Sequence, residues 1–351
     1  MNQRIIKVDT PDITAAIFGS YDANARIVEE RLAVTLRNRS GEDGTDAIVV
    51  TGESTENVNM AARVVEYLRD MARYNDRLTD QGVRYVVDMI ADGHGDELAD
   101  IGSDCIFVTS KGKPVRAKTV GQTKYIEAIK KNTVVIGVGP AGTGKTFLAV
   151  AMAVKALRDK QVSRIILTRP AIEAGERLGF LPGDLLSKID PYLRPLYDAL
   201  GEMLGAENHQ RLVEKGVIEV APLAYMRGRT LDDAFIILDE AQNATPEQVK
   251  MFLTRLGFGS KVVITGDLTQ TDLPYGQRSG LASAVKILEE IDDIAIHYLT
   301  EKDVVRHHLV QKIILAYDKY DREQFEKRQQ RENDRREGQG KQAFRPRREQ
   351  N

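Results

Sequence analysis

The stretch that decides the fold runs from Asn132 to Thr146 and reads Asn-Thr-Val-Val-Ile-Gly-Val-Gly-Pro-Ala-Gly-Thr-Gly-Lys-Thr. Its first half is typical of a buried strand, and the residues from Phe147 to Leu157 have the pattern of a helix. The motif Gly-x4-Gly-Lys-Thr lies between them, in the strand-to-helix context that it needs in order to bind phosphate. The sequence therefore predicts a site for ATP and Mg²⁺. The predicted phosphate loop comprises Gly139, Pro140, Ala141, Gly142, Thr143, Gly144, Lys145 and Thr146.

The chemistry of this loop requires particular side chains around it. The glycines let backbone N–H groups turn toward phosphate oxygens, where a Cβ would clash. We expect Lys145 to reach the β and γ phosphates and the Thr146 hydroxyl to ligate Mg²⁺. A later apolar strand ends in Asp239 and Glu240, at the edge of the sheet where α/β proteins bind ligands. Asp239 is predicted to hold Mg²⁺ through water, and Glu240 to orient or deprotonate the attacking water.

Two glutamines are candidates for reading the nucleotide. Gln270 follows the next strand in the pattern Gly-Asp-x-x-Gln and is predicted to sense the γ-phosphate. Gln122 lies on a predicted helix, residues 122–131, and its amide can donate and accept against the adenine edge. Tyr125, one turn further on, is a candidate for stacking on the base. The alternative for Gln122 is a solvated side chain on a surface helix.

Composition limits the kind of protein this is. The chain has 351 residues, a net charge of -2 and one cysteine, Cys105. Its length favours two domains with appendages, and a lone cysteine fits a reducing compartment. The sequence contains neither an apolar run long enough to span a bilayer nor the pattern of a secretory signal, so a cytoplasmic protein without a membrane partner is expected. Because the net charge is small, any surface for nucleic acid must be local.

The composition divides the chain into four regions. Residues 1–108 are predicted to form a small α+β domain, and residues 109–120, which carry four cations and no acid, a basic linker. Residues 121–320 alternate strands with helices, which predicts an α/β domain with a parallel sheet. Residues 321–351 are nearly devoid of apolar side chains and are predicted to be largely disordered. The strands expected in the α/β domain are Val134–Val138, Arg164–Leu167, Val217–Val220, Phe235–Leu238, Val262–Thr265 and Ile294–Leu299.

The first region resembles a small KH-type RNA-binding domain in its order of elements. A helix is expected over residues 23–32, two strands over 33–36 and 47–51, and a second helix over 55–71. Gly19-Ser-Tyr-Asp22 stands where a KH domain has the Gly-x-x-Gly clamp for an RNA backbone. An aspartate in place of the second glycine adds negative charge beside the phosphate path. The alternative is an assembly or docking domain of the same fold.

Four segments together resemble the PhoH-like family. They are Gly139–Thr146, the stretch 167–184, Ile237-Leu-Asp-Glu-Ala-Gln-Asn243 and Val263-Ile-Thr-Gly-Asp-Leu-Thr-Gln270. The resemblance covers about residues 110–318 and is most specific over 167–198. It implies a single RecA-like NTPase core related to superfamily 1 helicases and a link to RNA metabolism. For some members it also implies an endoribonuclease that processes ribosomal RNA as a partner.

The resemblance also suggests further site residues. Gln122 resembles the adenine-reading glutamine of helicases, and Gln270 their γ-phosphate sensor. Thr168-Arg-Pro170 resembles the segment that contacts a single-stranded backbone, so Arg169 and Arg177 are candidate nucleic-acid contacts. The alternative is structural pairing of these two arginines with Glu173, Glu176 or Asp184.

The chain departs from helicases in having no room for a second lobe after Leu299. In a helicase that lobe supplies an arginine that completes the site. A neighbouring subunit of a homo-oligomer, arranged as a ring, is the expected substitute, with Arg306 as the candidate residue and Arg278 as the alternative. An ordinary surface arginine on a helix is the other interpretation of Arg306.

Three functions are compatible with these motifs. The favoured one is a Mg²⁺-dependent ATPase acting on or alongside RNA. The second is a nucleotide-gated scaffold that recruits an endoribonuclease and hydrolyses little ATP itself. The third is a small-molecule kinase, which would need a basic lid and an acceptor pocket; Asp239-Glu-Ala-Gln242 fits attack by water better.

Overall fold

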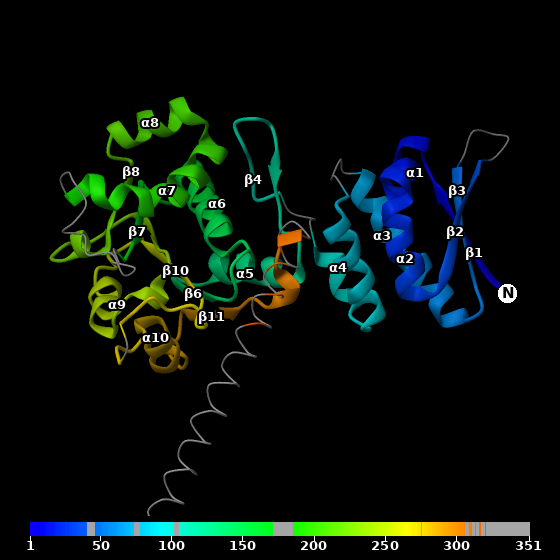
Figure 1. Cartoon of the computed structure of the whole chain (residues 1–351). Coiled ribbons are helices and arrows are strands. Elements are labelled where there is room, and N and C mark those ends of the chain that lie inside the picture. The colour runs from blue at the N-terminus through cyan, green and yellow to red at the C-terminus, as the bar shows by residue number, and fades with distance from the viewer. Residues whose placement is uncertain are drawn as a thin grey trace, which may run out of the picture. The chain divides into compact units, whose positions relative to one another are not determined.

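A computed structural model describes residues 1–305 except 41–45, 74–77, 102–104, 171–184 and 275, together with a few positions between 309 and 320. The chain forms two units, Met1–Val305 and Arg306–Asn351. The first unit contains a three-stranded sheet near the N-terminus and a six-stranded sheet after it (Figure 1). The tail predicted over 321–351 lies outside the described residues.

The N-terminal sheet is antiparallel and has the strand order β1-β3-β2. Buried and half-buried residues alternate along β3, because one face of the sheet packs on helices while the other is uncovered. The region thus has the predicted α+β character, and Gly19–Asp22 joins its first two helices. Its elements are β1 (Asn2–Val8), α1 (Pro11–Phe18), α2 (Ala23–Leu32), β2 (Val34–Ser40), β3 (Asp46–Gly52), α3 (Thr55–Arg73) and α4 (Asp80–Ala91).

Two signals in this region were present in the sequence but missed. Helix α1 begins at Pro11, directly after Thr10, whose hydroxyl accepts the N–H of Ile13. Helix α4 begins in the same way after Thr79, whose hydroxyl accepts the N–H of Gly82. Hydroxyl caps of this kind satisfy N–H groups that the first turn of a helix leaves unpaired.

The structure shows ordered elements within the segment 109–120, which was predicted as a basic linker. The strand β5 (Pro114–Val115) pairs with β4 (Phe107–Val108) in a short hairpin. Val115 and Ala117 are buried in the same hydrophobic cluster as the main helices. From Val115 to Lys118, buried apolar residues alternate with cations, which is the pattern of a segment with one face on a core.

The six-stranded sheet is parallel throughout and has the order β11-β6-β10-β9-β7-β8. All six predicted strands are confirmed, with ends that differ by one or two residues. Such short runs of valine and isoleucine suit strands that are buried on both faces. The strands are β6 (Val134–Val138), β7 (Arg164–Arg169), β8 (Ile218–Pro222), β9 (Ala234–Leu238), β10 (Lys261–Gly266) and β11 (Ile294–Tyr298).

Helices cover both faces of this sheet. One hydrophobic cluster joins the sheet to the helices α5 to α7, and a second joins its opposite face to α9 and α10. Among the described residues, no helix is both long and apolar enough to cross a membrane. The helices are α5 (Val120–Lys131), α6 (Lys145–Arg158), α7 (Leu185–Leu204), α8 (Ala206–Glu214), α9 (Pro246–Leu253) and α10 (Gly280–Leu288).

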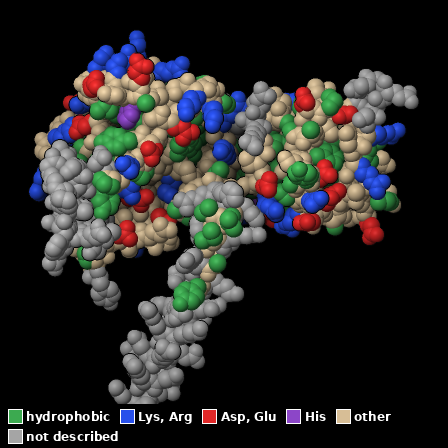
Figure 2. Space-filling model, turned by 45° about the horizontal axis from the view of Figure 1, so that its top comes forward, with side chains coloured by type: hydrophobic (Ala, Val, Ile, Leu, Met, Phe, Trp, Pro, Cys, Tyr) green, Lys and Arg blue, Asp and Glu red, His purple; other side chains and the backbone are tan. Residues whose placement is uncertain are grey.

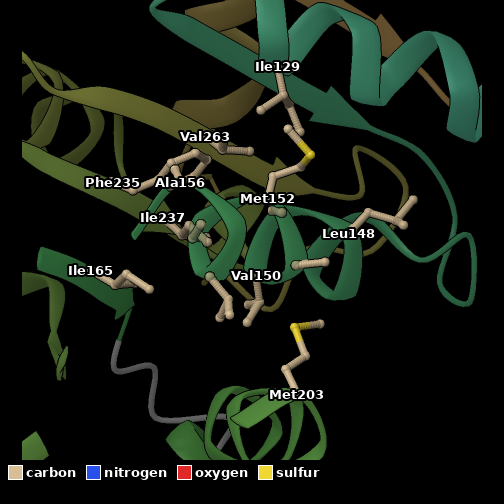
Figure 3. Packing of buried hydrophobic residues seen from close by; sticks show 14 of the residues in the cluster. Ile129, Leu148, Val150, Met152, Ala156, Ile165, Met203, Phe235, Ile237 and Val263 are labelled. Carbon is tan, nitrogen blue, oxygen red and sulfur yellow. The ribbon is translucent and has the colours of Figure 1, made fainter. Parts of the chain in front are cut away.

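Helix α6 lies at the centre of the first cluster (Figure 3). Its side chains from Leu148 to Ala156 share this cluster with Ile165, Ile237 and Val263, which come from three neighbouring strands, and with Ile129 of α5 and Met203 of α7. Burial on nearly all sides fixes the helix against the sheet, since each buried aliphatic side chain contributes about 1.5–3 kcal/mol. The first turn of α6, which begins at Lys145, is therefore held at a fixed distance from the strand ends.

Candidate functional site

The phosphate loop has the predicted place between β6 and α6. Gly142 and Gly144 have φ angles of 89° and 81°, in the left-handed region that favours glycine. The ammonium of Lys145 donates to the carbonyl oxygens of Gly139 and Pro140, at 2.6 and 2.8 Å. The outer side of the loop is held by the N–H of Val305, which donates to the Gly142 carbonyl at 2.8 Å. The loop is thus shaped from both sides.

Next to the loop, a row of polar side chains crosses the sheet. Thr265 lies beside Gly137 in the register of β10 with β6, while Leu238 pairs with Ile264 on one side and Thr168 on the other. Ile264, Leu238 and Thr168 are thus neighbours on three adjacent strands. Side chains alternate between the two faces of a sheet, so the three residues that follow them share the face that is covered by α6. Thr265, Asp239 and Arg169 therefore lie side by side at the carboxyl edge of the sheet.

Asp239 is the centre of this row. One carboxylate oxygen, Oδ1, accepts the hydroxyls of Thr146 at 2.6 Å and of Thr265 at 2.7 Å. Only 3% of Asp239 is exposed, so these bonds offset the cost of burying its charge. The structure thus brings together Thr146 and Asp239, the two residues expected to hold Mg²⁺.

These two residues fit a magnesium ion that arrives with a nucleotide. Mg²⁺ usually keeps several waters and is bound through one or two protein groups plus substrate phosphates. A hydroxyl and a carboxylate 2.6 Å apart at the end of a phosphate loop provide such a pair. Among the described residues there is no cluster of three or more histidine, cysteine or acidic side chains of the kind that holds a metal by itself.

Glu240 is held in an unusual backbone conformation. Its φ and ψ are 53° and 42°, a left-handed geometry that costs a non-glycine residue about 1–2 kcal/mol. The side-chain amide of Gln242 donates to Glu240 Oε2 and, through its oxygen, accepts the N–H of Asp267 at 3.0 Å. A Cβ on Gly266 would lie 2.6 Å from that amide oxygen, so this approach requires a glycine. The carboxylate of Glu240 is therefore oriented by a buried neighbour that we did not predict from the sequence.

Arg169 contacts both acidic residues. Its guanidinium lies 3.9 Å from Asp239 Oδ2 and 3.8 Å from Glu240 Oε1. Its Nη1 donates to the carbonyl of Tyr192 on α7 at 3.1 Å, and 21% of the side chain is exposed. The sequence suggested a contact with nucleic acid, whereas the structure places this cation beside the carboxylates. The other candidate, Arg177, lies outside the described residues.

Gln122 lies at the back of the phosphate loop. It is 4% exposed, donates to the carbonyl of Thr143 at 3.0 Å and accepts the N–H of Lys118 at 2.7 Å. It is therefore not a solvated side chain on a surface helix. The predicted contact with adenine stays a prediction, and the amide of Gln122 has one further donor and one further lone pair for it.

Tyr125 is not available for stacking on a base, so that suggestion was wrong. Its side chain is fully buried and packs beside the ring of His297 at 5.7 Å between centroids. A Cβ on Gly137 would lie 2.7 Å from the Tyr125 ring, so the glycine makes room for it. Burial also raises the pKa of this phenol well above its usual range. Tyr125 is a core residue beneath the site.

The remaining candidates lie away from this cluster or outside the described residues. Gln270 and Arg278 are exposed, and neither makes a contact with the cluster in the part of the chain that the structure describes. Arg306 falls among the residues that are not described. The predicted roles of these three residues in sensing or completing the nucleotide site stay predictions.

Comparison with known proteins places the chain in a family. The family described as PhoH-like protein matches residues 114–318. A PhoH-like protein of Mycobacterium tuberculosis is 56% identical over 89% of this chain and 86% of its own length. The PhoH-like protein of Bacillus subtilis is 51% identical over 91% of this chain and 97% of its own length. Protein PhoH of Escherichia coli is 48% identical over 58% of this chain and 58% of its own length. The chain therefore belongs to the PhoH-like protein family of nucleotide-binding P-loop NTPases.

Proposed function

We propose that this protein hydrolyses ATP with Mg²⁺ and uses the hydrolysis in RNA metabolism, in ribosomal RNA processing or RNA remodelling. The observation that carries the hydrolytic part is the contact of Asp239 with Thr146, next to a Glu240 that is oriented by Gln242. A site for binding alone would need the phosphate loop, but it would not need an oriented carboxylate beside it. We disfavour a small-molecule kinase because Asp239-Glu-Ala-Gln242 fits attack by water better than transfer to an acceptor molecule.

Each residue has a defined part in this mechanism. Lys145 and the loop N–H groups bind the phosphates, while Thr146 and Asp239 hold Mg²⁺. Mg²⁺ supplies neutralisation of phosphate charge when it is bound. Glu240 orients the attacking water and accepts its proton, because it follows Asp239 directly at the carboxyl edge of the sheet. Gln122 is the proposed reader of adenine.

Support for a role on RNA comes from the N-terminal domain. Gly19–Asp22 forms a turn between α1 and α2, as in a KH-type clamp, and Tyr21 in it is 93% exposed. On the face seen in Figure 2, cationic and anionic side chains are interspersed, in keeping with the net charge of -2. An RNA contact would then depend on a few local groups rather than on a broad basic surface.

The deciding experiment is ATP turnover with and without single-stranded RNA, on particles whose mass is measured in the same buffer. We expect RNA to raise turnover. Glu240→Gln should still bind ATP but lose hydrolysis, while Glu290→Gln, a change of the same kind at an exposed position, should behave as the unaltered protein. Undiminished turnover in Glu240→Gln would exclude the role of Glu240 as the base.

The second candidate function is a nucleotide-gated scaffold that recruits an endoribonuclease. It is favoured by the exposed position of Gln270, the expected γ-phosphate sensor, which has no hydrogen bond to Asp239 or Glu240 in the part of the chain that the structure describes. Such a protein would turn over slowly alone and would respond to its protein partner instead of RNA. A homo-oligomer, arranged as a ring, would offer a further source of such a group.

A further inference from the structure

We propose that Arg169 completes the triphosphate site within a single chain, by moving from the two carboxylates to the γ-phosphate of bound ATP. This inference rests on the proposed ATPase function. It makes Arg169 a catalytic residue, and it removes the need for Arg306 or Arg278 of a neighbouring subunit at the γ-phosphate.

The position of Arg169 in the sheet carries the first step. It follows Thr168, which pairs with Leu238, and so it stands next to Asp239 in the row at the carboxyl edge. Asp239 in turn contacts Thr146 in the first turn of α6. A γ-phosphate bound by Lys145, with its Mg²⁺ at Thr146 and Asp239, would lie close to Asp239, and hence to the guanidinium beside it.

The contacts of the guanidinium carry the second step. At 3.8 and 3.9 Å its distances to Glu240 and Asp239 are those of ion pairs but too long for hydrogen bonds. An arginine has five N–H donors, and among the described residues the structure gives it one hydrogen bond, from Nη1 to Tyr192. The charge of Arg169 is thus neutralised while most of its donors remain available for a phosphate.

Charge balance carries the third step. When Mg²⁺ is held by Asp239 and a water by Glu240, both carboxylates gain another partner. The guanidinium can then turn to the phosphate, whose planar oxygen pairs it matches. With only 21% of the side chain exposed, the surroundings are poor in water, so its charge acts strongly there.

The first test compares Arg169→Gln with Arg164→Gln, a matched change on the same strand at the end away from the site. Arg164 donates to the carbonyl of Asp232. We expect Arg169→Gln to lower kcat by about 10²–10³-fold, as removal of one transition-state donor does. Arg164→Gln should leave kcat within about threefold. Equal kcat in Arg169→Gln and the unaltered protein would overturn the proposal.

A second readout does not depend on turnover. Aluminium fluoride, bound with Mg²⁺ and ADP, imitates the phosphoryl group in the transition state of hydrolysis. Trapping of labelled ADP in this complex therefore reports the transition-state contact. Arg169→Gln should bind ADP alone with unchanged Kd, which also shows that it is folded, but should fail to trap it. Loss of ADP affinity to the same degree as loss of trapping would contradict a contact with the γ-phosphate.

A mixing experiment decides between one chain and two. Arg169→Gln and Glu240→Gln are mixed, their subunits are allowed to exchange, and ATP turnover is then measured. If Arg169 acts in its own chain, the mixture has no more activity than the two variants measured separately. Recovered activity would show that Arg169 reaches a neighbour's site and would overturn the assignment. If the unaltered protein hydrolyses no ATP, the proposed function fails, while the trapping result still judges Arg169.

Discussion

Two turns of this molecule share a strained backbone but differ in how it is supported. Glu240 in the P-loop core has a φ of 53°, and Tyr21 and Asp22 in the N-terminal domain have φ angles of 53° and 60°. Around Glu240, the side chains of Gln242 and Arg169 contact the carboxylate. Tyr21, in contrast, is 93% exposed.

This difference in support indicates a different function for each of the two turns. Strain that is held by buried neighbours preorganises a group for chemistry, since the group needs no rearrangement when the reaction occurs. The other turn has Gly19 at its base, against the buried side chain of Asn24, while the ring of Tyr21 lies in solvent. An exposed aromatic residue on such a turn is suited to contact with a partner. The core turn predicts large effects on turnover, and the N-terminal turn smaller effects on binding.

The largest effect is expected from Asp239→Asn. The change removes the negative charge at the centre of the row, while the amide oxygen of asparagine can still accept the hydroxyls of Thr146 and Thr265. We expect Mg²⁺-dependent turnover to fall by at least about 10³-fold, as for other groups that hold charge at the transition state. Asp22→Asn, the same substitution on the N-terminal turn, is the control. ATP turnover over a range of Mg²⁺ concentrations checks both, and equal turnover in the two variants would break the comparison.

A smaller loss is expected from Gln242→Ala. Glu240 would lose the amide that orients it, and the N–H of Asp267 would be left unpaired in a buried place. We expect turnover to fall by about 10²-fold, and the free energy of unfolding by about 1–3 kcal/mol. Kinetics and urea unfolding of the same sample separate these two effects. A variant that loses stability but keeps full kcat would show that Gln242 has only a structural part.

Much of the core could be predicted because its signals are local. The phosphate loop, six strands and the pair Thr146 and Asp239 follow from short runs of residue types, and a parallel sheet brings strand ends together. The partners of Glu240 were harder to see. Gln242 contacts the N–H of Asp267, which directly follows β10, and this contact depends on the order of strands in the sheet.

Arg169 shows a signal that was present but not used. Ile165, Leu167 and Arg169 are alternate residues of β7, and Phe235 and Ile237 of β9 are continued in the same alternation by Asp239, directly after the strand. Both series share the hydrophobic cluster under α6, which places the arginine and the aspartate on one face. The reverse error occurred at Tyr125, where an aromatic residue near a predicted adenine site suggested stacking. The burial of Tyr125 depends on packing against Gly137, a contact between a helix and a strand that the sequence did not reveal.

A moderate effect on binding is expected from Tyr21→Ala. If the exposed ring stacks on a base of single-stranded RNA, its removal should cost about 1–3 kcal/mol, or about 5- to 150-fold in Kd. Phe258→Ala is the matched control, because Phe258 is 92% exposed and lies in the P-loop core. Fluorescence anisotropy with a labelled RNA measures both. Equal Kd values for the two variants would mean that the N-terminal turn is not the RNA contact.

The smallest effect concerns His297, next to Gly137 on the edge strand of the core sheet. Burial lowers the pKa of this imidazole below its ordinary value of 6.5, and its Nε2 lies 2.8 Å from the carbonyl of Gly121. The unfolded chain therefore takes up a proton at a higher pH than the folded one. Stability is fully present above pH 6.5 and falls as the pH drops through the lowered value.

The size of this fall follows from exposure. Since His297 is only partly buried, solvent screening limits the loss to no more than about 1 kcal/mol. His297→Gln keeps a donor for Gly121 but cannot titrate, so its stability should change less between pH 7 and 5 than that of the unaltered protein. His94→Gln, at an exposed position in the N-terminal domain, should not reduce that change. Urea unfolding at several pH values measures this change. Parallel curves of stability against pH for His297→Gln and the unaltered protein would contradict a lowered pKa for His297.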